Sequence, residues 1–329
     1  MSKLGTGQMR LDNYRKVIEV IQQDNIVDKK QVAEKTNLTV ATVGTILNVF
    51  REKEIIKEKS KRLNQKGRPT VQYQLNPDFF HYLNLIFYKK ESENFLAIEV
   101  HNAKSDCLFQ DEQKMTELDE STLKTKLLPI LKDDPDIQLI VVGLPALISE
   151  DSVIESDISA FKGKSIKTWF EALFNLPIIV KNDMNLCALG YYEQLDSKED
   201  ISYMWLPEHD GPGCGTVING KLLEGRNQIA GEVIYLPFFN FLKSQNVTYT
   251  EDIIAKTIVS LSALMNPSQV VLVSQQLHQK DLIKIKSICH QYLPANFMPQ
   301  LFLKKEYLND YFKGMAVTAT HFYWMQFAF

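Results

Sequence analysis

Cysteine is scarce in this chain of 329 residues, and its four copies lie far apart in the sequence. No CxxC pair occurs, which argues against a zinc ribbon and against a disulfide framework. Isolated thiols fit a reducing cytosol instead. The four positions are Cys107, Cys187, Cys214 and Cys289.

Long apolar runs are missing as well. No stretch approaches the roughly 18 uninterrupted apolar residues that a membrane-spanning helix requires. The apolar tail of residues 315–329 is interrupted by Thr, His and Gln, which predicts a core helix. Residues 1–16 lack the apolar region of a signal peptide. We therefore expect a cytoplasmic protein without a membrane partner.

Charge is distributed unevenly along the chain, whose net charge is -3. Residues 1–76 hold 15 Lys and Arg and 8 Asp and Glu, a net of +7, whereas the remaining residues hold 22 and 32, a net of -10. Such a split is typical of a basic module that binds a polyanion and an acidic body that would repel it. Chance clustering of solvated charge is the alternative, so charge by itself favours nucleic acid only weakly.

Three helical patterns follow one another in the basic module. Apolar residues recur at three- and four-residue spacing over residues 11–23, on one face of a helix. Asp28 caps a short second helix that ends near Asn37, and Thr39 caps a third over residues 40–52. Two helices joined by so short a turn are typical of a helix-turn-helix.

The second helix of that motif presents its N-terminal residues to base edges in the major groove of DNA. The residues at this place are small and mostly hydroxylated, which suits close approach, phosphate contacts and a methyl contact to thymine. They are Thr39, Val40, Ala41, Thr42 and Thr45.

A basic wing follows the helices. Residues 70–75 alternate between apolar and polar side chains, which predicts a strand that pairs with a short one across the basic segment 57–66. Lys61 and Arg62 lie in this segment, and Arg68 lies between Gly and Pro at its return, where it can insert into a narrow minor groove. These residues complete the expected DNA contacts.

We therefore predict a winged helix-turn-helix DNA-binding domain over residues 1–76, with a helical bundle and a solvated basic loop as the alternative. In the rest of the chain, apolar strands alternate with helices, which indicates α/β layers with largely parallel strands. Strands are expected at residues 83–87, 95–100, 137–142, 177–180 and 270–273, and helices at 121–132, 165–174 and 251–265.

Three loops at predicted strand ends are rich in glycine or in Asn and Asp. They cover residues 143–146, 181–185 and 211–215. Ordinary turn chemistry would explain each one alone, because Asn and Asp cap helices and glycine makes corners. Three such loops in one fold favour a ligand cleft, since ligands collect at the carboxyl ends of strands in α/β sheets.

Taken in order, these segments resemble the ROK family, named for repressors, open reading frames and kinases. The resemblance covers essentially the whole chain and implies that residues 77–329 form a two-lobed, actin-like ATPase fold that senses a sugar and assembles as a dimer or tetramer. The motifs that carry it are the winged helix with its Gly-Arg-Pro turn, Gly143-Leu144-Pro145, Asn182-Asp183, the glycine loop 211–215, Asn219-Gly220 and Ala230-Gly231-Glu232.

The resemblance also assigns ligand-binding residues. In the family's kinases, the position of Asp183 is the general base for a sugar hydroxyl, and the positions of Asn182 and Glu232 hydrogen-bond the sugar. Pro145 belongs to the first of these loops. Glu251 falls where a Glu closes the family's sugar pocket, although the dipole of a helix also favours Glu in its first turn.

The nucleotide loops of the family are absent. Its first loop is an Asp-x-Gly-x-Thr-like turn, but residues 85–91 contain neither Asp nor glycine. Its second has Gly-Gly after an apolar strand, where residues 273–277 read Val-Ser-Gln-Gln-Leu. Glycine lets backbone N–H groups approach phosphates, and the acid handles magnesium. We therefore expect no kinase activity and no cofactor.

The zinc motif of the family is absent too. Glu232 is followed by Val-Ile-Tyr rather than Gly-His, and residues 236–250 contain no cysteine or histidine. A structural zinc site needs three or four such ligands at short spacing, so we expect no metal.

The sequence thus predicts a transcriptional regulator of repressor type for carbohydrate genes. Its expected partners are a double-stranded DNA operator, a sugar or sugar phosphate effector, and further copies of itself in a homodimer or tetramer. Trp205 can stack on a sugar ring, although a core position is the better interpretation. A sugar kinase with a DNA-binding head, and a regulator whose body only dimerises, are the alternatives.

Overall fold

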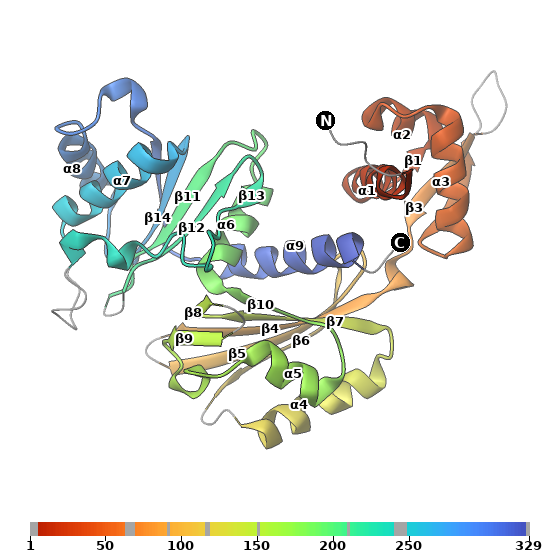
Figure 1. The fold of residues 1–329 in the computed structure, drawn as a ribbon, viewed down its shortest axis with the longest axis horizontal. Helices are drawn as coiled ribbons and strands as arrows, with labels where there is room; N and C mark the ends of the chain where they lie inside the picture. Colours follow the sequence, from red (N-terminus) through yellow and green to blue (C-terminus); the bar gives the residue numbers. More distant parts are fainter. Residues whose placement is uncertain are drawn as a thin grey trace.

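The computed structural model describes residues 6–62, 70–90, 93–115, 119–149, 152–208, 211–239 and 249–326. A helical head and two α/β lobes are visible in Figure 1, and the long helix α9 (Leu308–Gln326) runs between the lobes toward the head. Within the described ranges, no helix is long and apolar enough to cross a membrane.

The head begins with three helices whose ends are set by local capping. The Asp28 carboxylate accepts hydrogen bonds from N–H groups of the first turn of α2, and the Gln31 side chain accepts one from the Asp28 N–H. Asn37 ends α2 in the left-handed conformation, and the Thr39 hydroxyl caps α3 by accepting from the Thr42 N–H. The predicted helices are confirmed as α1 (Thr6–Asp24), α2 (Lys29–Thr36) and α3 (Val40–Glu52).

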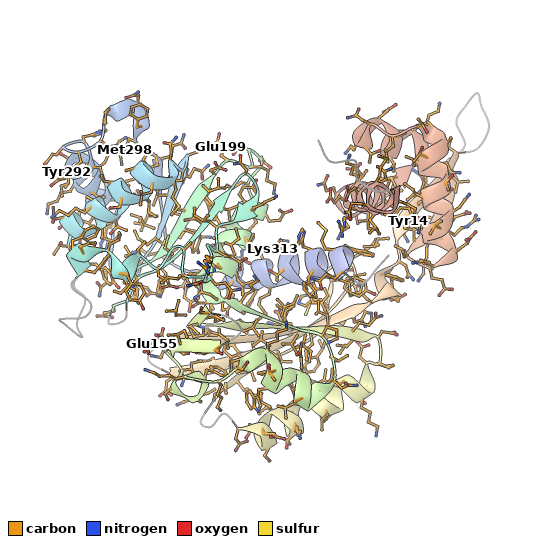
Figure 2. All side chains as sticks on the ribbon, viewed as in Figure 1. Tyr14, Glu155, Glu199, Tyr292, Met298 and Lys313 are labelled. Atoms are coloured by element: carbon orange, nitrogen blue, oxygen red, sulfur yellow. The ribbon has the colours of Figure 1, made fainter. Side chains whose placement is uncertain are left out.

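An antiparallel sheet of order β1-β3-β2 completes the head. Helices and sheet share one core, in which Tyr14 lies edge-on to Phe50 at 5.4 Å between ring centroids (Figure 2). The strands expected around the basic segment are present, but residues 63–69 at its return lie outside the described residues. The strands are β1 (Val27–Asp28), β2 (Ile56–Arg62) and β3 (Thr70–Leu75).

The first lobe is built on a five-stranded sheet of order β10-β7-β4-β5-β6. Strands β7 and β10 run parallel to β4, whereas β5 and β6 return antiparallel. Helices α4 (Glu120–Asp133) and α5 (Ile166–Phe174) cover one face, and α9 crosses the other (Figure 1). The strands are β4 (His81–Lys90), β5 (Glu93–Asn102), β6 (Cys107–Lys114), β7 (Ile137–Leu144) and β10 (Ile178–Asn182), with a hairpin of β8 (Ala146–Ser149) and β9 (Ser152–Ser156).

The second lobe repeats this plan. Its sheet has the order β13-β12-β11-β14-β15, again an antiparallel meander followed by two parallel strands. Helix α6 packs on one face, and α7 and α8 pack on the other. The elements are α6 (Asp183–Glu193), β11 (Ile201–Trp205), β12 (Gly213–Ile218), β13 (Lys221–Leu222), α7 (Glu251–Met265), β14 (Gln269–Val273), α8 (Gln279–Cys289) and β15 (Gln300–Lys304).

Some elements differ from the sequence prediction. Strand β6 was not expected, because its side chains are exposed along almost its whole length and show no apolar alternation. The C-terminal helix was expected from residue 315 but begins at Leu308, since its first turns are more polar than its end. The two-lobed α/β arrangement agrees with the prediction.

Candidate functional site

The candidate site is centred on the start of α6, where Asn182 ends strand β10. The side-chain oxygen of Asn182 accepts hydrogen bonds from the N–H groups of Met184 and Asn185 at 2.9 and 3.1 Å. Its amide nitrogen donates to the carbonyl of Ala146 at 2.8 Å. Asn182 therefore caps α6 and bonds it to the Gly-Leu-Pro loop. This structural role is additional to the sugar contact that the resemblance implies.

The loop with Pro145 lies at the same point because β7 and β10 are parallel neighbours, with Asn182 opposite Leu144. Pro145 is buried, and its carbonyl accepts hydrogen bonds from the N–H of Asp157 at 3.1 Å and the hydroxyl of Ser156 at 3.0 Å. This bonding holds Asp157 against the site. Since the carbonyl of Pro145 is engaged, only its ring is left to contact a ligand.

Glycines allow the second sheet to pack closely on α6, and the segment before Glu232 to pack closely on that sheet. A Cβ on Gly215 would lie 2.4 Å from the carbonyl oxygen of Met184. A Cβ on Gly231, which has a φ of +96°, would lie 2.4 Å from the carbonyl oxygen of Cys214. Since Glu232 follows Gly231, these close contacts carry its carboxyl group toward the start of α6.

The carboxyl groups of the site are hard to ionise. Burial raises the pKa of Asp183 well above its usual value, and the charges of Asp157 and Glu232 raise it further, against a hydrogen bond from the Met184 N–H. Burial also raises the pKa of Glu232 to about 7. A protonated carboxyl group both donates and accepts hydrogen bonds, so the two groups suit the hydroxyls of a polyol.

Two tyrosines from the C-terminal segment stand beside Asp183, which the sequence did not predict. The ring of Tyr307 lies 5.0 Å from that of Trp205, and the hydroxyl of Tyr311 donates to the carbonyl of Phe87 at 3.2 Å. Burial, and then the charge of Asp183, raises the pKa of both tyrosines. Trp205 is half-buried and packs against Tyr307.

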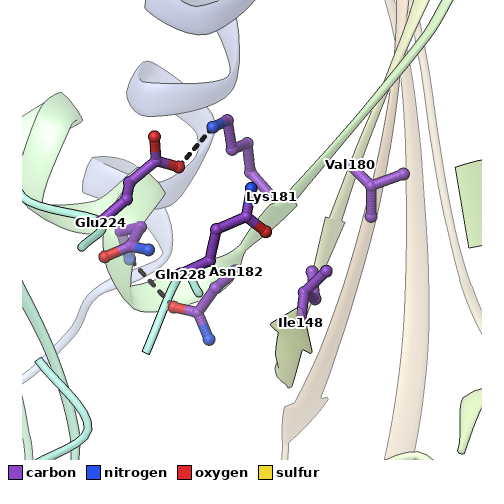
Figure 3. A pocket seen from close by; sticks show the side chains of 7 residues that line it. Ile148, Val180, Lys181, Asn182, Glu224 and Gln228 are labelled. Carbon is purple, nitrogen blue, oxygen red and sulfur yellow. Dashed lines mark hydrogen bonds and ion pairs between the residues drawn. The ribbon is translucent and has the colours of Figure 1, made fainter. Parts of the chain in front are cut away.

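A hollow of about 220 Å³ opens beside Asn182, between residues of both lobes (Figure 3). Lys181 and Glu224 pair across it at 2.5 Å. Asn185 is buried at its wall, and its side-chain oxygen has no hydrogen-bond partner among the described residues. The sequence prediction missed Asn185, although it lies one helical turn after Asn182. The volume of about 220 Å³ includes open solvent, and the hollow itself has room for little more than a water molecule, whereas most ligand pockets enclose roughly 300–1,000 Å³. A sugar here therefore requires the lobes to open.

Glu251 is engaged within the second lobe. Its carboxylate lies 2.7 Å from Lys284 on α8, and the hydrogen bond from Lys284 lowers its pKa. Thr250 caps the helix that Glu251 begins. The part of Glu251 in a sugar pocket stays a prediction.

The segments at the places of the family's two nucleotide loops accept hydrogen bonds from residues near the C-terminus. At the end of β4, the hydroxyl of Tyr311 donates a hydrogen bond to the carbonyl of Phe87. After β14, the ammonium group of Lys305 donates to the carbonyls of Gln275 and Leu277 at 2.7 and 2.6 Å. In this second loop the N–H groups of Gln276 and Leu277 also donate to the Ser274 hydroxyl at 3.3 and 3.4 Å, whereas a phosphate-binding loop presents free N–H groups to its ligand.

One group among the described residues is close enough to hold a metal ion. His81, Asp134 and Asp136 place ligand atoms within 4.8 Å of one another, at the amino end of β4. Nδ1 of His81 already pairs with Asp134 at 2.7 Å. Asp183 follows the carboxyl end of β10, so this group does not belong to the candidate site.

A second candidate interface lies at the start of α3. Thr39, Val40, Ala41 and Thr45 are exposed there, and Thr42 is half-buried. Val40 is exposed to 50%, which leaves its methyl groups available to a partner, although single exposed apolar residues are ordinary on protein surfaces.

Asn48 extends this row and was missed by the sequence prediction. It is exposed one turn after Thr45, so helical spacing could have identified it. The side chains of Lys61 and Arg62 and the whole of Arg68 lie outside the part of the chain that the structure describes.

Comparison with known proteins gives a family match in the middle of the chain. Residues 99–236 match the model of the ROK family. The chain is 22% identical over 236 residues to the xylose repressor of Staphylococcus xylosus, and 24% identical over 234 residues to the DNA-binding transcriptional dual regulator NagC of Escherichia coli K12. These matches cover 68% and 67% of this chain and 59% and 56% of the relatives, so the chain matches less than two thirds of their length.

Solved structures share the fold. A crystal structure of a ROK family transcriptional regulator, a homologue of the E. coli MLC protein, superposes with a TM-score of 0.74 at 16% identity and covers 96% of this chain and 98% of its own. A ROK hexokinase from Thermus thermophilus gives a TM-score of 0.57 at 15% identity and covers 73% of this chain and 97% of its own. Regulators and kinases share this fold, so function has to be argued from the sites.

Proposed function

From the match of residues 99–236 to the ROK family model, we propose that the chain belongs to this family and is a DNA-binding transcriptional regulator of carbohydrate genes, of repressor type, whose body binds a sugar or sugar phosphate. The observation that carries the proposal is the exposed row at the start of α3, beside the hairpin of the basic segment. The superposition with a ROK transcriptional regulator covers 96% of this chain, whereas that with a ROK hexokinase covers 73%, so the regulator shares the fold over more of the chain.

The head has the parts that a winged helix-turn-helix uses on DNA. With α3 in the major groove, the methyl groups of Val40 contact a thymine methyl, and the amide of Asn48 pairs with an adenine edge. Lys61, Arg62 and Arg68 of the wing contact phosphates and the minor groove. Residues 1–76 carry a net charge of +7, which favours the polyanion.

The body has the parts of a polyol site. Asp183 and Glu232 offer carboxyl groups that donate and accept hydrogen bonds, with Pro145 and Asn182 on the neighbouring loops. Sugar binding that favours one arrangement of the lobes would shift the chain toward that arrangement. In a homodimer or tetramer, such a shift changes the spacing of the two heads relative to the half-sites of an operator.

A sugar kinase with a DNA-binding head has less support. Phosphoryl transfer needs a nucleotide and its metal held in line with the acceptor, and Asp183 alone cannot supply that geometry. After β14, the N–H groups of Gln276 and Leu277 already donate to the Ser274 hydroxyl, so they do not face a phosphate. We therefore propose that the chain is not an enzyme.

A thermal-shift screen tests the effector. The probes are D-xylose, N-acetylglucosamine, N-acetylglucosamine 6-phosphate and ATP with magnesium, each with the wild type, Asp183→Asn and the surface control Asp252→Asn. Saturation at about 100 times Kd stabilises the folded chain by about 2.7 kcal/mol, which raises Tm measurably. The proposal expects one sugar to stabilise the wild type and the control but not Asp183→Asn. Stabilisation by ATP would support the kinase, and no shift with any probe would favour a body that only dimerises.

A further inference from the structure

Helix α9 connects the candidate effector site with the head. It has 19 residues and is therefore roughly 28 Å long, at about 1.5 Å per residue. In Figure 1 it begins between the two lobes and ends beside the linker to the head. Its exposed face carries Lys313, and its opposite face packs on the first sheet (Figure 2).

The first end of α9 lies beside Asp183. Tyr307 precedes the helix and Tyr311 lies in its first turn, where the Tyr311 N–H donates to the Tyr307 carbonyl at 2.9 Å. Asp183 acts electrostatically on both rings. A Cβ on Gly143, in the Gly-Leu-Pro loop, would lie 2.5 Å from the hydroxyl oxygen of Tyr311. Any ligand that moves these loops therefore pushes on the start of α9.

The same end is fixed to the second lobe. Asp310 is buried, pairs with Lys304 of β15, and accepts hydrogen bonds from Tyr203 of β11 at 2.7 Å and from Gln194 at 3.1 Å. These bonds make the start of α9 follow the second sheet when the lobes move.

The far end of α9 holds the linker and the head. The ring of Tyr323 stacks on Phe80 with centroids 3.5 Å apart, and Trp324 stacks on Phe79 at 5.8 Å with an angle of 7° between the ring planes. The guanidinium group of Arg15, in α1, donates to the carbonyl of Met325 at 2.9 Å. We call Phe79, Phe80, Tyr323 and Trp324 the aromatic clamp.

We propose that α9 is the coupling element of the chain: a change in lobe arrangement at Tyr307 and Tyr311 moves α9, and the aromatic clamp passes that movement to α1 and the head. The inference rests on the proposed function and adds the route by which an effector reaches DNA. Coupling needs an element that both sites bias, and α9 packs against α6 at the effector site and against α1 in the head.

The reporter for this coupling is Trp324, one of three tryptophans in the chain. With Trp169→Phe and Trp205→Phe, the full chain emits from the aromatic clamp alone. Tyr311→Phe removes only the hydroxyl that bonds Phe87, and Tyr307→Phe is a second mild variant should the first lower stability. Tyr292→Phe, at an exposed position in the second lobe, is the matched control.

The inference expects Tyr311→Phe or Tyr307→Phe to shift the emission of Trp324 at a distance of about 20 Å along the helix, and Tyr292→Phe to leave it unchanged. A local structural role of either tyrosine would leave Trp324 unaffected, so unchanged emission in both variants overturns the inference. The readout needs neither sugar nor DNA. A chain that binds no DNA would therefore contradict the proposed function while the emission still decides the coupling.

Discussion

Gly190 on α6 and Gly314 on α9 let the two helices cross backbone against backbone. A Cβ on Gly190 would lie 1.9 Å from the carbonyl oxygen of Asp310, and a Cβ on Gly314 would lie 1.9 Å from that of Leu186. Because α6 begins at Asp183, this crossing fixes the candidate sugar site to the helix that reaches the head.

Gly190→Ala is expected to destabilise the fold strongly. The added methyl group meets main-chain atoms that cannot rotate away, so the cost reaches the upper part of the range for overpacking, about 3 kcal/mol. Gly7→Ala is the control, since a Cβ there meets nothing within 4 Å. Urea denaturation of both variants checks the prediction, and equal midpoints would contradict the close crossing.

Asp310→Ala removes the carboxylate that anchors α9 to the second lobe. The change leaves Lys304 without its partner and Tyr203 without its acceptor, so we expect a loss of about 3 kcal/mol or more. Asp252→Ala breaks an exposed pair with Lys256 and is expected to leave Tm almost unchanged. If thermal melts show similar losses for both variants, Asp310 is not an anchor.

Glu232 makes the stability of the folded chain depend on pH, and the direction follows from its raised pKa. Burial raises its pKa to about 7, whereas the unfolded chain releases this proton near the ordinary value of 4.5. The folded state binds more protons between these values, so this contribution to stability is lost as pH rises through about 7.

Glu232→Gln should therefore flatten the decline of Tm between about pH 4.5 and 7. Some decline remains, because the raised pKa of Asp183 acts with the same sign. Glu251→Gln is the control: its pKa is lowered, so the carboxylate stays ionised throughout this range and its removal leaves the slope of Tm against pH unchanged. A Glu232→Gln profile with the wild-type slope would show that Glu232 is not desolvated.

Val40→Asp tests the interface on α3. A carboxylate at this exposed position repels phosphates and loses the methyl contact, so we expect DNA affinity to fall about tenfold or more. Leu128→Asp places the same charge at a similarly exposed apolar position on α4 and should have no effect. Fluorescence anisotropy at fixed salt measures both variants, and equal affinities would place the DNA elsewhere.

Arg68→Ala tests the wing. Loss of one cationic contact should weaken binding to all sequences and reduce the slope of log affinity against log salt by about one. The fold should be intact, which circular dichroism checks. An unchanged affinity and slope would contradict the assignment of Arg68 to the minor groove.

Local signals explain why the head was predictable. Asp28 and Thr39 are capping residues whose hydrogen bonds reach only two or three positions along the chain, so the sequence alone located both helix starts. The buried strands β7 and β14 were found because both faces are apolar.

The features of the site that the sequence did not predict depend on contacts between segments that lie far apart in the chain. Tyr307 and Tyr311 meet Lys89 and Phe87 across more than 200 positions, and no local pattern announces such a pairing. The capping of α6 by Asn182 is local, and ordinary turn chemistry explains it, but its bond to Ala146 exists only once β7 and β10 lie side by side. Domain limits at residue 76 and the roles of the site residues stay predictions.

The most direct test of the central claim is a selection of random double-stranded DNA on the full chain, with Val40→Asp as the parallel control. A regulator of this kind predicts enrichment of two related half-sites about 10 base pairs apart, or a multiple of that spacing. It also predicts that an enriched duplex binds the wild type far more tightly than the variant. Sequences enriched equally by both proteins, or no enrichment at all, would contradict the account.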